Sequence, residues 1–153
     1  MELEKGPFVV AQSVSVDDPY DDTDPNVIIL PIDGSPVDVL TVDVCVKQPQ
    51  KTQVSLDSMG QIAAFIASAG ANSFEVKYEI LRNNNSIAII NDEMDYQGAN
   101  ERRHTNFPNF PVVDNNPNAG INTYVLQCTQ VSASGPSLIA VGSRSLKATV
   151  FTL

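Results

Sequence analysis

The sequence has little of what side-chain catalysis requires. Among 153 residues there are one histidine, two cysteines and no tryptophan. Catalysis by a histidine-activated nucleophile would depend on His104 alone, and no Gly-x-Ser-x-Gly turn or comparable nucleophile context occurs. Arg102 and Arg103 precede His104 and would disfavour its protonation, but in an acidic protein we expect both arginines to pair with its own carboxylates. We therefore expect His104 to be a surface loop residue, and we predict no enzyme activity, no catalytic residue and no cofactor.

The two cysteines are too few for a disulfide framework and lack the spacing of metal ligands. Both lie within alternating runs, where side-chain parity tells the faces apart. Cys128 shares a face with Tyr124, which we expect to face the core, whereas Cys45 shares the wetter face with Asp43. We favour free thiols over an intrachain disulfide, and an intermolecular bond through Cys45 stays open.

Basic residues and long apolar runs are also scarce. Nine Lys and Arg stand against 18 Asp and Glu, a formal net charge of −9, which argues against nucleic acid and anionic membranes as partners. No apolar run approaches the roughly 18 residues of a membrane span. The first ten residues mix both charges and lack the pattern of a signal peptide, so we expect no export by the usual route. Charged residues make up only 18% of the chain. A surface with so little charge is common in proteins that pack against copies of themselves, and it also occurs in ordinary secreted β-domains.

Alternation of apolar and polar residues dominates what is present. From Phe74 to Arg82 every second residue is apolar, which is typical of a strand with one buried and one wet face. The stretch 61–69 would tolerate a helix, but we predict a strand, with Gly60 as a bulge or bend. Asn83, Asn84 and Asn85 predict a hairpin turn. We therefore expect an all-β, antiparallel sandwich or jelly roll of seven to nine strands over residues 37–153.

The first 36 residues are expected to form an N-terminal arm. Its apolar stripe lies on one face of a strand over residues 7–16: Phe8, Val10, Val14 and Val16. An acidic hinge follows: Asp17, Asp18, Asp21, Asp22 and Asp24. A short strand at 27–30 and a turn at 33–36 precede the body. The stripe must be buried somewhere, either on a neighbouring subunit or as the first strand of its own sandwich.

The hinge is also the best candidate for a metal site, but its pattern is incomplete. Four residues have the spacing of calcium-loop ligands: Asp22, Asp24, Asn26 and Asp33. Val27 occupies the position where such a loop needs glycine. We favour a solvated hinge and predict no metal site, although looser calcium binding in this run stays open.

Two closing stretches, 109–126 and 142–151, resemble small all-β proteins on the spore surface of Bacillus-type bacteria. The shared features are an aspartate at Asp114, a Pro-x-Ala-Gly turn at 117–120, the pair Thr123-Tyr124, and the run Gly142 to Phe151. The stretches 56–58 and 76–84 are similar to a strand and hairpin of the same group. The resemblance covers about residues 37–153. It implies a jelly roll like that of the tumour-necrosis-factor and C1q group, often trimeric, and a role in the exosporium or in spore-associated fibres.

The expected function is therefore a non-enzymatic, self-assembling structural protein of the spore surface, joined by strand docking of the arm. Its expected partners are copies of itself, as a trimer or polymer, and other spore-surface proteins. This chain lacks a cysteine-rich arm and a collagen-like repeat. The alternative is a carbohydrate- or receptor-binding module such as a fibre knob, which the same fold would serve. The absence of tryptophan weakens the sugar-binding alternative.

Overall fold

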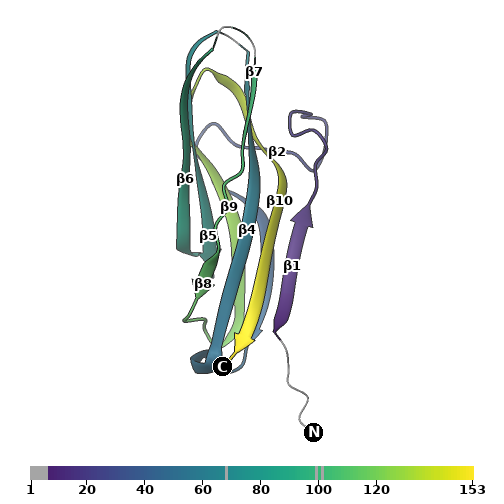
Figure 1. The fold of residues 1–153 in the computed structure, drawn as a ribbon, viewed down its shortest axis with the longest axis vertical. Helices are drawn as coiled ribbons and strands as arrows, with labels where there is room; N and C mark the ends of the chain where they lie inside the picture. The colour runs from purple at the N-terminus through teal and green to yellow at the C-terminus, as the bar shows by residue number, and fades with distance from the viewer. Residues whose placement is uncertain (1–6, 68, 99, 101) are drawn as a thin grey trace.

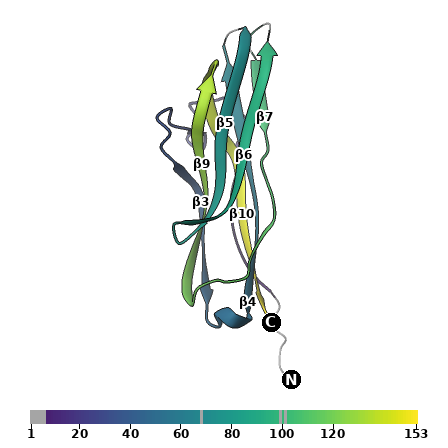
Figure 2. The same cartoon turned by 90° about the vertical axis from the view of Figure 1, so that its left-hand side faces the viewer.

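The computed structural model describes residues 7–67, 69–98, 100 and 102–153, and it is an elongated sandwich of two antiparallel sheets (Figure 1). One sheet, here called sheet A, has the strand order β1 (Phe8–Val14), β10 (Pro136–Thr152), β4 (Thr52–Ile66) and β7 (Arg102–Asn106). Two short strands extend it: β2 (Ile28–Ile29) pairs with β10, and β8 (Val112–Asp114) pairs with β4. The other, sheet B, has the order β3 (Val37–Val46), β9 (Gly120–Ser134), β5 (Gly70–Arg82) and β6 (Asn85–Gly98) (Figure 2).

The all-β prediction is confirmed, and eight strands, β3 to β10, lie in the described part of the body. The only helical element there is the single 3-10 turn η1 (Pro49–Lys51). No helix among the described residues has the length and hydropathy needed to cross a bilayer.

The core lies between the sheets and follows the alternation in the sequence. On β5 the side chains of Phe74, Val76, Tyr78 and Ile80 are all buried, while Lys77 between them is partly exposed. The predicted hairpin after β5 is confirmed, because Asn83 and Asn84 have φ of 48° and 69°. Asparagine tolerates this left-handed region better than most residues, so the turn requires these side chains.

The ambiguous stretch is a strand, as predicted, but only as far as Ile66, and Ser68 lies outside the described residues. Its apolar residues are not confined to one face, because Ala63 and Ala64 are both fully buried. Tyr20, from the segment after β1, lies beside this part of the sheet: its hydroxyl bonds to His104 and Thr105 of β7, which pair with Ala64 and Ala63. A strand covered on both faces loses its period of two, which is why the sequence also suited a helix.

The prediction of a bulge at Gly60 is wrong. Gly60 lies within β4, and the extra residue lies on β10, between Val141 and Arg144. The reason for the glycine is steric, since a Cβ atom there would lie 3.2 Å from the Tyr78 ring. The Tyr78 hydroxyl donates a hydrogen bond of 2.6 Å to Ser58 Oγ on the same strand as Gly60. Gly60 therefore leaves room for a buried aromatic ring rather than bending the chain.

Candidate interaction surfaces

Strand β1 is an edge strand of sheet A in the single chain. It pairs antiparallel with β10 through seven residue pairs, from Phe8 opposite Val150 to Val14 opposite Arg144. Burial along the predicted stripe rises toward its C-terminal end: Phe8 is 64% exposed, Val10 and Val14 are partly buried, and Val16 is 7% exposed. The segment thus occupies its own sandwich, which is the alternative that the sequence left open. The separation of residues 1–36 from the body as an arm stays a prediction about an assembled state.

Strand β1 also contacts the edge of sheet B. Gln12 Oε1 accepts a hydrogen bond of 2.9 Å from the backbone N–H of Thr41 on β3. β3 is the edge strand of sheet B, so this N–H lies on the side without a strand partner. β1 therefore closes the seam between the two sheets on one side of the sandwich.

The acidic segment after β1 is a series of tight turns. The carboxylates of Asp18, Asp21 and Asp24 each accept the backbone N–H two residues further on, at 2.8–2.9 Å. Hydrogen bonds from the Thr23 hydroxyl and backbone hold the pKa of Asp21 below its ordinary value. Asp33 likewise accepts a hydrogen bond from the backbone N–H of Ser35. These oxygens point at their own backbone, and no three carboxylate, histidine or cysteine groups converge among the described residues.

This segment is attached to the body more firmly than a solvated hinge. Pro19 is buried. The Tyr20 hydroxyl donates to the carbonyl of His104 at 2.8 Å and lies 2.8 Å from Thr105 Oγ1. The Arg103 guanidinium lies 4.9 Å from the centroid of the Tyr20 ring, a cation–π distance. The acidic residues of the hinge therefore lie on both sides of Tyr20, which is fixed to β7 of sheet A.

A second anchor is the bulge of β10, at Ser143 and Arg144. The Ser143 hydroxyl accepts from Val16 N–H at 2.9 Å and donates to the Val16 carbonyl at 3.1 Å. Arg144, 7% exposed, donates to three backbone carbonyls, those of Val39, Asn26 and Gly142, at 2.8–3.1 Å. Burial lowers the pKa of Arg144. One guanidinium thus joins β3, the segment before β2 and the bulge itself.

Asp114 and Tyr124, two residues of the spore-protein resemblance, belong to a third network. Arg82 Nη1 donates to both carboxylate oxygens of Asp114 at 2.8 Å and to the carbonyl of Asn116 at 2.6 Å. The Tyr124 hydroxyl donates to Asp114 Oδ2 at 2.8 Å. Burial, followed by this hydrogen bond, raises the pKa of Tyr124. The residues that carry the resemblance therefore connect strands rather than line a reactive site.

The prediction that His104 is a surface loop residue is wrong. It lies on β7, opposite Ala64 of β4, and it is partly buried. Its ring centroid is 4.2 Å from that of Tyr96 on β6, so the two edge strands meet through these side chains. β7 is a five-residue edge strand that ends at Asn106, before Pro108. Prolines confine nearby strands to edges and short pieces, as here.

The β6–β7 seam carries further polar side chains. Asn106 donates to Asp92 Oδ1 at 2.8 Å, and burial raises the pKa of Asp92. Asp92 Oδ2, Tyr96 OH and His104 Nε2 are buried without a protein partner in the described structure. Alternation along residues 90–96 places Asp92 and Tyr96 inward, but a sequence alone does not say which strand faces them. These groups make the seam polar where most of the core is apolar.

Both cysteines are free thiols, with Cys128 buried and Cys45 exposed, as side-chain parity predicted. Burial raises the pKa of Cys128 to about 12. An intermolecular bond through Cys45 stays a prediction.

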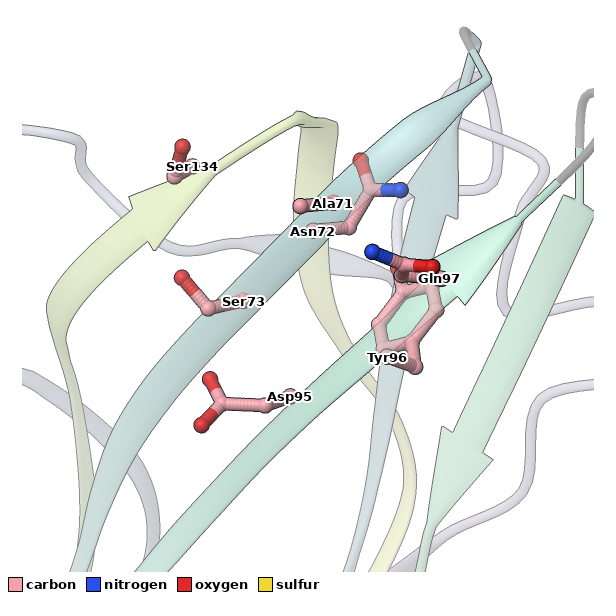
Figure 3. Close-up of a pocket in the computed structure, with 7 residues that line it drawn as sticks. All are labelled: Ala71, Asn72, Ser73, Asp95, Tyr96, Gln97 and Ser134. Atoms are coloured by element: carbon pink, nitrogen blue, oxygen red, sulfur yellow. The ribbon is translucent and has the colours of Figure 1, made fainter.

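Among the hollows in the described part of the surface are two grooves. The first, of about 430 Å³, lies where β5, β6 and the end of β9 run together (Figure 3). Ser73 and Asp95 project to the same side of sheet B there, while Tyr96 projects from the other side of β6. The second, of about 640 Å³, lies between the start of β1, the end of β3 and the end of β10. Its apolar residues are Phe8, Val46 and Val150, and Cys45 and Lys47 also line it.

No family model and no curated protein matches the chain. Among solved structures, the VP2 subviral particle of infectious bursal disease virus aligns with a TM-score of 0.47 and 12% identity, over 95% of this chain and 33% of that one. Dimeric latent PorU from Porphyromonas gingivalis aligns with a TM-score of 0.45 and 11% identity, over 96% of this chain and 13% of that one. This chain thus corresponds to a third or less of the length of these proteins. Similarities of this size carry no functional assignment.

Proposed function

We propose that the chain is a non-enzymatic structural subunit that assembles with copies of itself by exchanging strand β1. The observation that carries the proposal is the edge position of β1. It pairs with β10, and Phe8 and Val9 at its start are 64% and 52% exposed. A strand on an edge with little of its surface buried is the element that costs least to remove. The place of action that we propose is the spore surface, in the exosporium or in a fibre, on the strength of the motif resemblance.

The anchors after β1 define what moves. Val16 is held by Ser143, and Tyr20 is held on β7, so residues 16–26 stay on the body when β1 leaves. The seven residues of β1 span about 23 Å when extended, a reach sufficient to cross to an adjacent subunit. A neighbouring β10 would offer the same seven residue pairs, so exchange preserves the pairing and adds the contacts between subunits.

The stripe supplies the gain in free energy on docking. Fully burying a valine or phenylalanine side chain contributes about 1.5–3 kcal/mol before the cost of ordering. In the single chain Phe8 realises only part of this, because 64% of its surface is exposed. We therefore expect a neighbouring subunit that covers Phe8 to stabilise the exchanged state over the closed monomer.

Truncation and a peptide test the exchange. A variant lacking residues 1–14 should stay folded, because both anchors remain, but should leave the edge of β10 open. A synthetic peptide of residues 7–16 should bind this variant and should not bind the intact monomer. Sedimentation of the intact chain should show oligomers that the free peptide inhibits.

Val10 and Val9 provide a matched pair on the same strand. Val10 faces Ala148 of the core and Val9 points outward with 52% exposure. A peptide that carries Val10→Asp should no longer bind the truncated chain, whereas a peptide that carries Val9→Asp should bind it as the parent peptide does. Oligomers that persist in the truncated chain, or equal effects of the two aspartates, would show that β1 is only an intrachain strand.

The binding-module alternative has one supporting observation, the groove in Figure 3. The groove is lined by Ser73, Ser134, Asn72, Gln97 and Asp95, whose hydroxyl, amide and carboxylate groups suit a polyhydroxylated ligand. Glycan-array binding by the intact chain that Asp95→Ala removes would favour this alternative over a purely structural role.

A further inference from the structure

One apolar side chain is more exposed than any other large one in the described part of the chain. Ile32 is 92% exposed, at a turn in which Gly34 N–H bonds to the Pro31 carbonyl. Gly34 has φ of +80°, a conformation that glycine adopts without strain, so the turn is well defined. Asp33 follows Ile32 in the turn and is also exposed. The turn therefore presents an apolar knob beside a negative charge.

The groove at the end of β3 has the complementary character. Phe8, Val46 and Val150 form its apolar lining. Lys47 is the only charged residue among the described residues that line it, and its side chain is exposed. The volume of about 640 Å³ lies within the usual range of about 300–1,000 Å³ for binding clefts. An apolar side chain flanked by a carboxylate matches this groove in both hydrophobicity and charge.

The knob and the groove lie at opposite ends of one strand. The Ile32 turn is separated from the first residue of β3 by Ser35 and Pro36, and the groove includes Val46, the last residue of β3. Ten extended residues span about 33 Å, so the two features do not meet within one chain. Figure 1 shows the start of β1 and the end of β10, which flank the groove, together at the lower end of the molecule.

We propose that the Ile32 turn of one copy docks in the groove between β1, β3 and β10 of the next copy. Each copy offers one knob and one groove on different patches, so the contact is heterologous: it gives a ring where the rotation between copies closes and a filament where it does not. The inference rests on the proposed self-assembly, but it does not require exchange of β1, because the groove is complete when β1 pairs with its own β10.

Cross-linking tests the contact directly, because Cys45 already lines the groove. Ile32→Cys would place a second thiol at the knob. Oxidation with copper phenanthroline should then join the thiols of neighbouring copies, and a non-reducing gel should show a ladder beyond the dimer. The same substitution combined with Cys45→Ser should give no more than dimers. Ile89→Cys, at an isoleucine 56% exposed on β6, is the matched control and should give no ladder.

Affinity and charge provide the second readout, by sedimentation over a concentration series. Ile32→Ser should weaken self-association by about 10- to 100-fold, whereas Ile89→Ser should leave it unchanged. Asp33→Lys and Lys47→Asp should each weaken it, and the two together should restore it.

Three outcomes would overturn the inference. The first is the absence of a ladder with Ile32→Cys. The second is an equal effect of Ile32→Ser and Ile89→Ser. The third is a ladder that forms only after residues 1–6 are removed, since the chain's own start would then occupy the groove. Failure of strand exchange would be seen instead as a peptide of residues 7–16 that does not bind the chain lacking residues 1–14, while the cross-linked ladder of the intact Ile32→Cys chain is still present.

Discussion

The carboxylate of Asp114 accepts hydrogen bonds from three residues, so its replacement should lower the free energy of unfolding by an amount that can be worked out. Arg82 donates to both carboxylate oxygens, Tyr124 to one, and Asn116 N–H to the other at 3.0 Å. Asp114→Ala would leave the Tyr124 hydroxyl buried without an acceptor and Arg82 without its counter-ion. Breaking a buried ion pair costs about 3–5 kcal/mol. Arg82 is 21% exposed and keeps its bond to Asn116, so the lower end, about 3 kcal/mol, applies.

The assay is thermal unfolding followed by circular dichroism. For a domain of this size a loss of about 3 kcal/mol lowers Tm by roughly 6–12 °C. Asp57→Ala is the matched control, because Asp57 lies 3.7 Å from Lys147 in a pair whose side chains are 53% and 50% exposed. An exposed pair contributes about 0–1 kcal/mol, so Tm should fall by no more than about 4 °C. Equal shifts for the two variants would refute the reasoning that burial makes the Asp114 network strong.

Two further predictions concern buried groups. Burial raises the pKa of Asp92 above its ordinary value of 3.8, so its protonated form stabilises the fold below about that pH, and this contribution is lost as pH rises through the folded pKa. Asp92→Asn should therefore be more stable than the parent at pH 7, by about 1–3 kcal/mol in urea unfolding, and equal to it near pH 3; a variant less stable at pH 7 would contradict this. For the thiols, Ellman's reagent at pH 8 should modify Cys45 rapidly in the folded chain and Cys128 only after denaturation, because burial raises the Cys128 pKa to about 12. Loss of the fast phase in Cys45→Ser is the check, and rapid modification of two thiols in the folded parent would contradict the assignment.

Two wrong predictions have one physical origin. The sequence predicts that His104 lies in a surface loop, yet it lies on β7, which pairs with β4. The sequence predicts a bulge or bend at Gly60, yet the extra residue lies on β10 and Gly60 accommodates the Tyr78 ring. Each depends on a neighbour from another part of the chain, and a local pattern contains no information about that neighbour.

For the functional residues too, local patterns predicted which face a side chain lies on but not which distant residue it contacts. Parity on a strand correctly separated buried Cys128 from exposed Cys45. Parity also found the apolar stripe of β1, but not the strand that it meets. The sequence did not predict that Arg144 is buried. Its partners are the backbone carbonyls of Val39, Asn26 and Gly142. Every residue has such a carbonyl, so no residue type marks the partner.

The all-β class, the alternation of buried and exposed positions, and the asparagine hairpin after β5 follow from the sequence alone. These are local properties, since the strand period and the turn conformation depend on residues a few positions apart. The three-dimensional fold was needed to show that β1 closes the seam beside β3, that Arg144 is buried, and that the Ile32 knob and the groove lie at opposite ends of one strand. Those facts depend on contacts across long separations, such as the 127 positions between Val16 and Ser143, where the whole fold selects the partner.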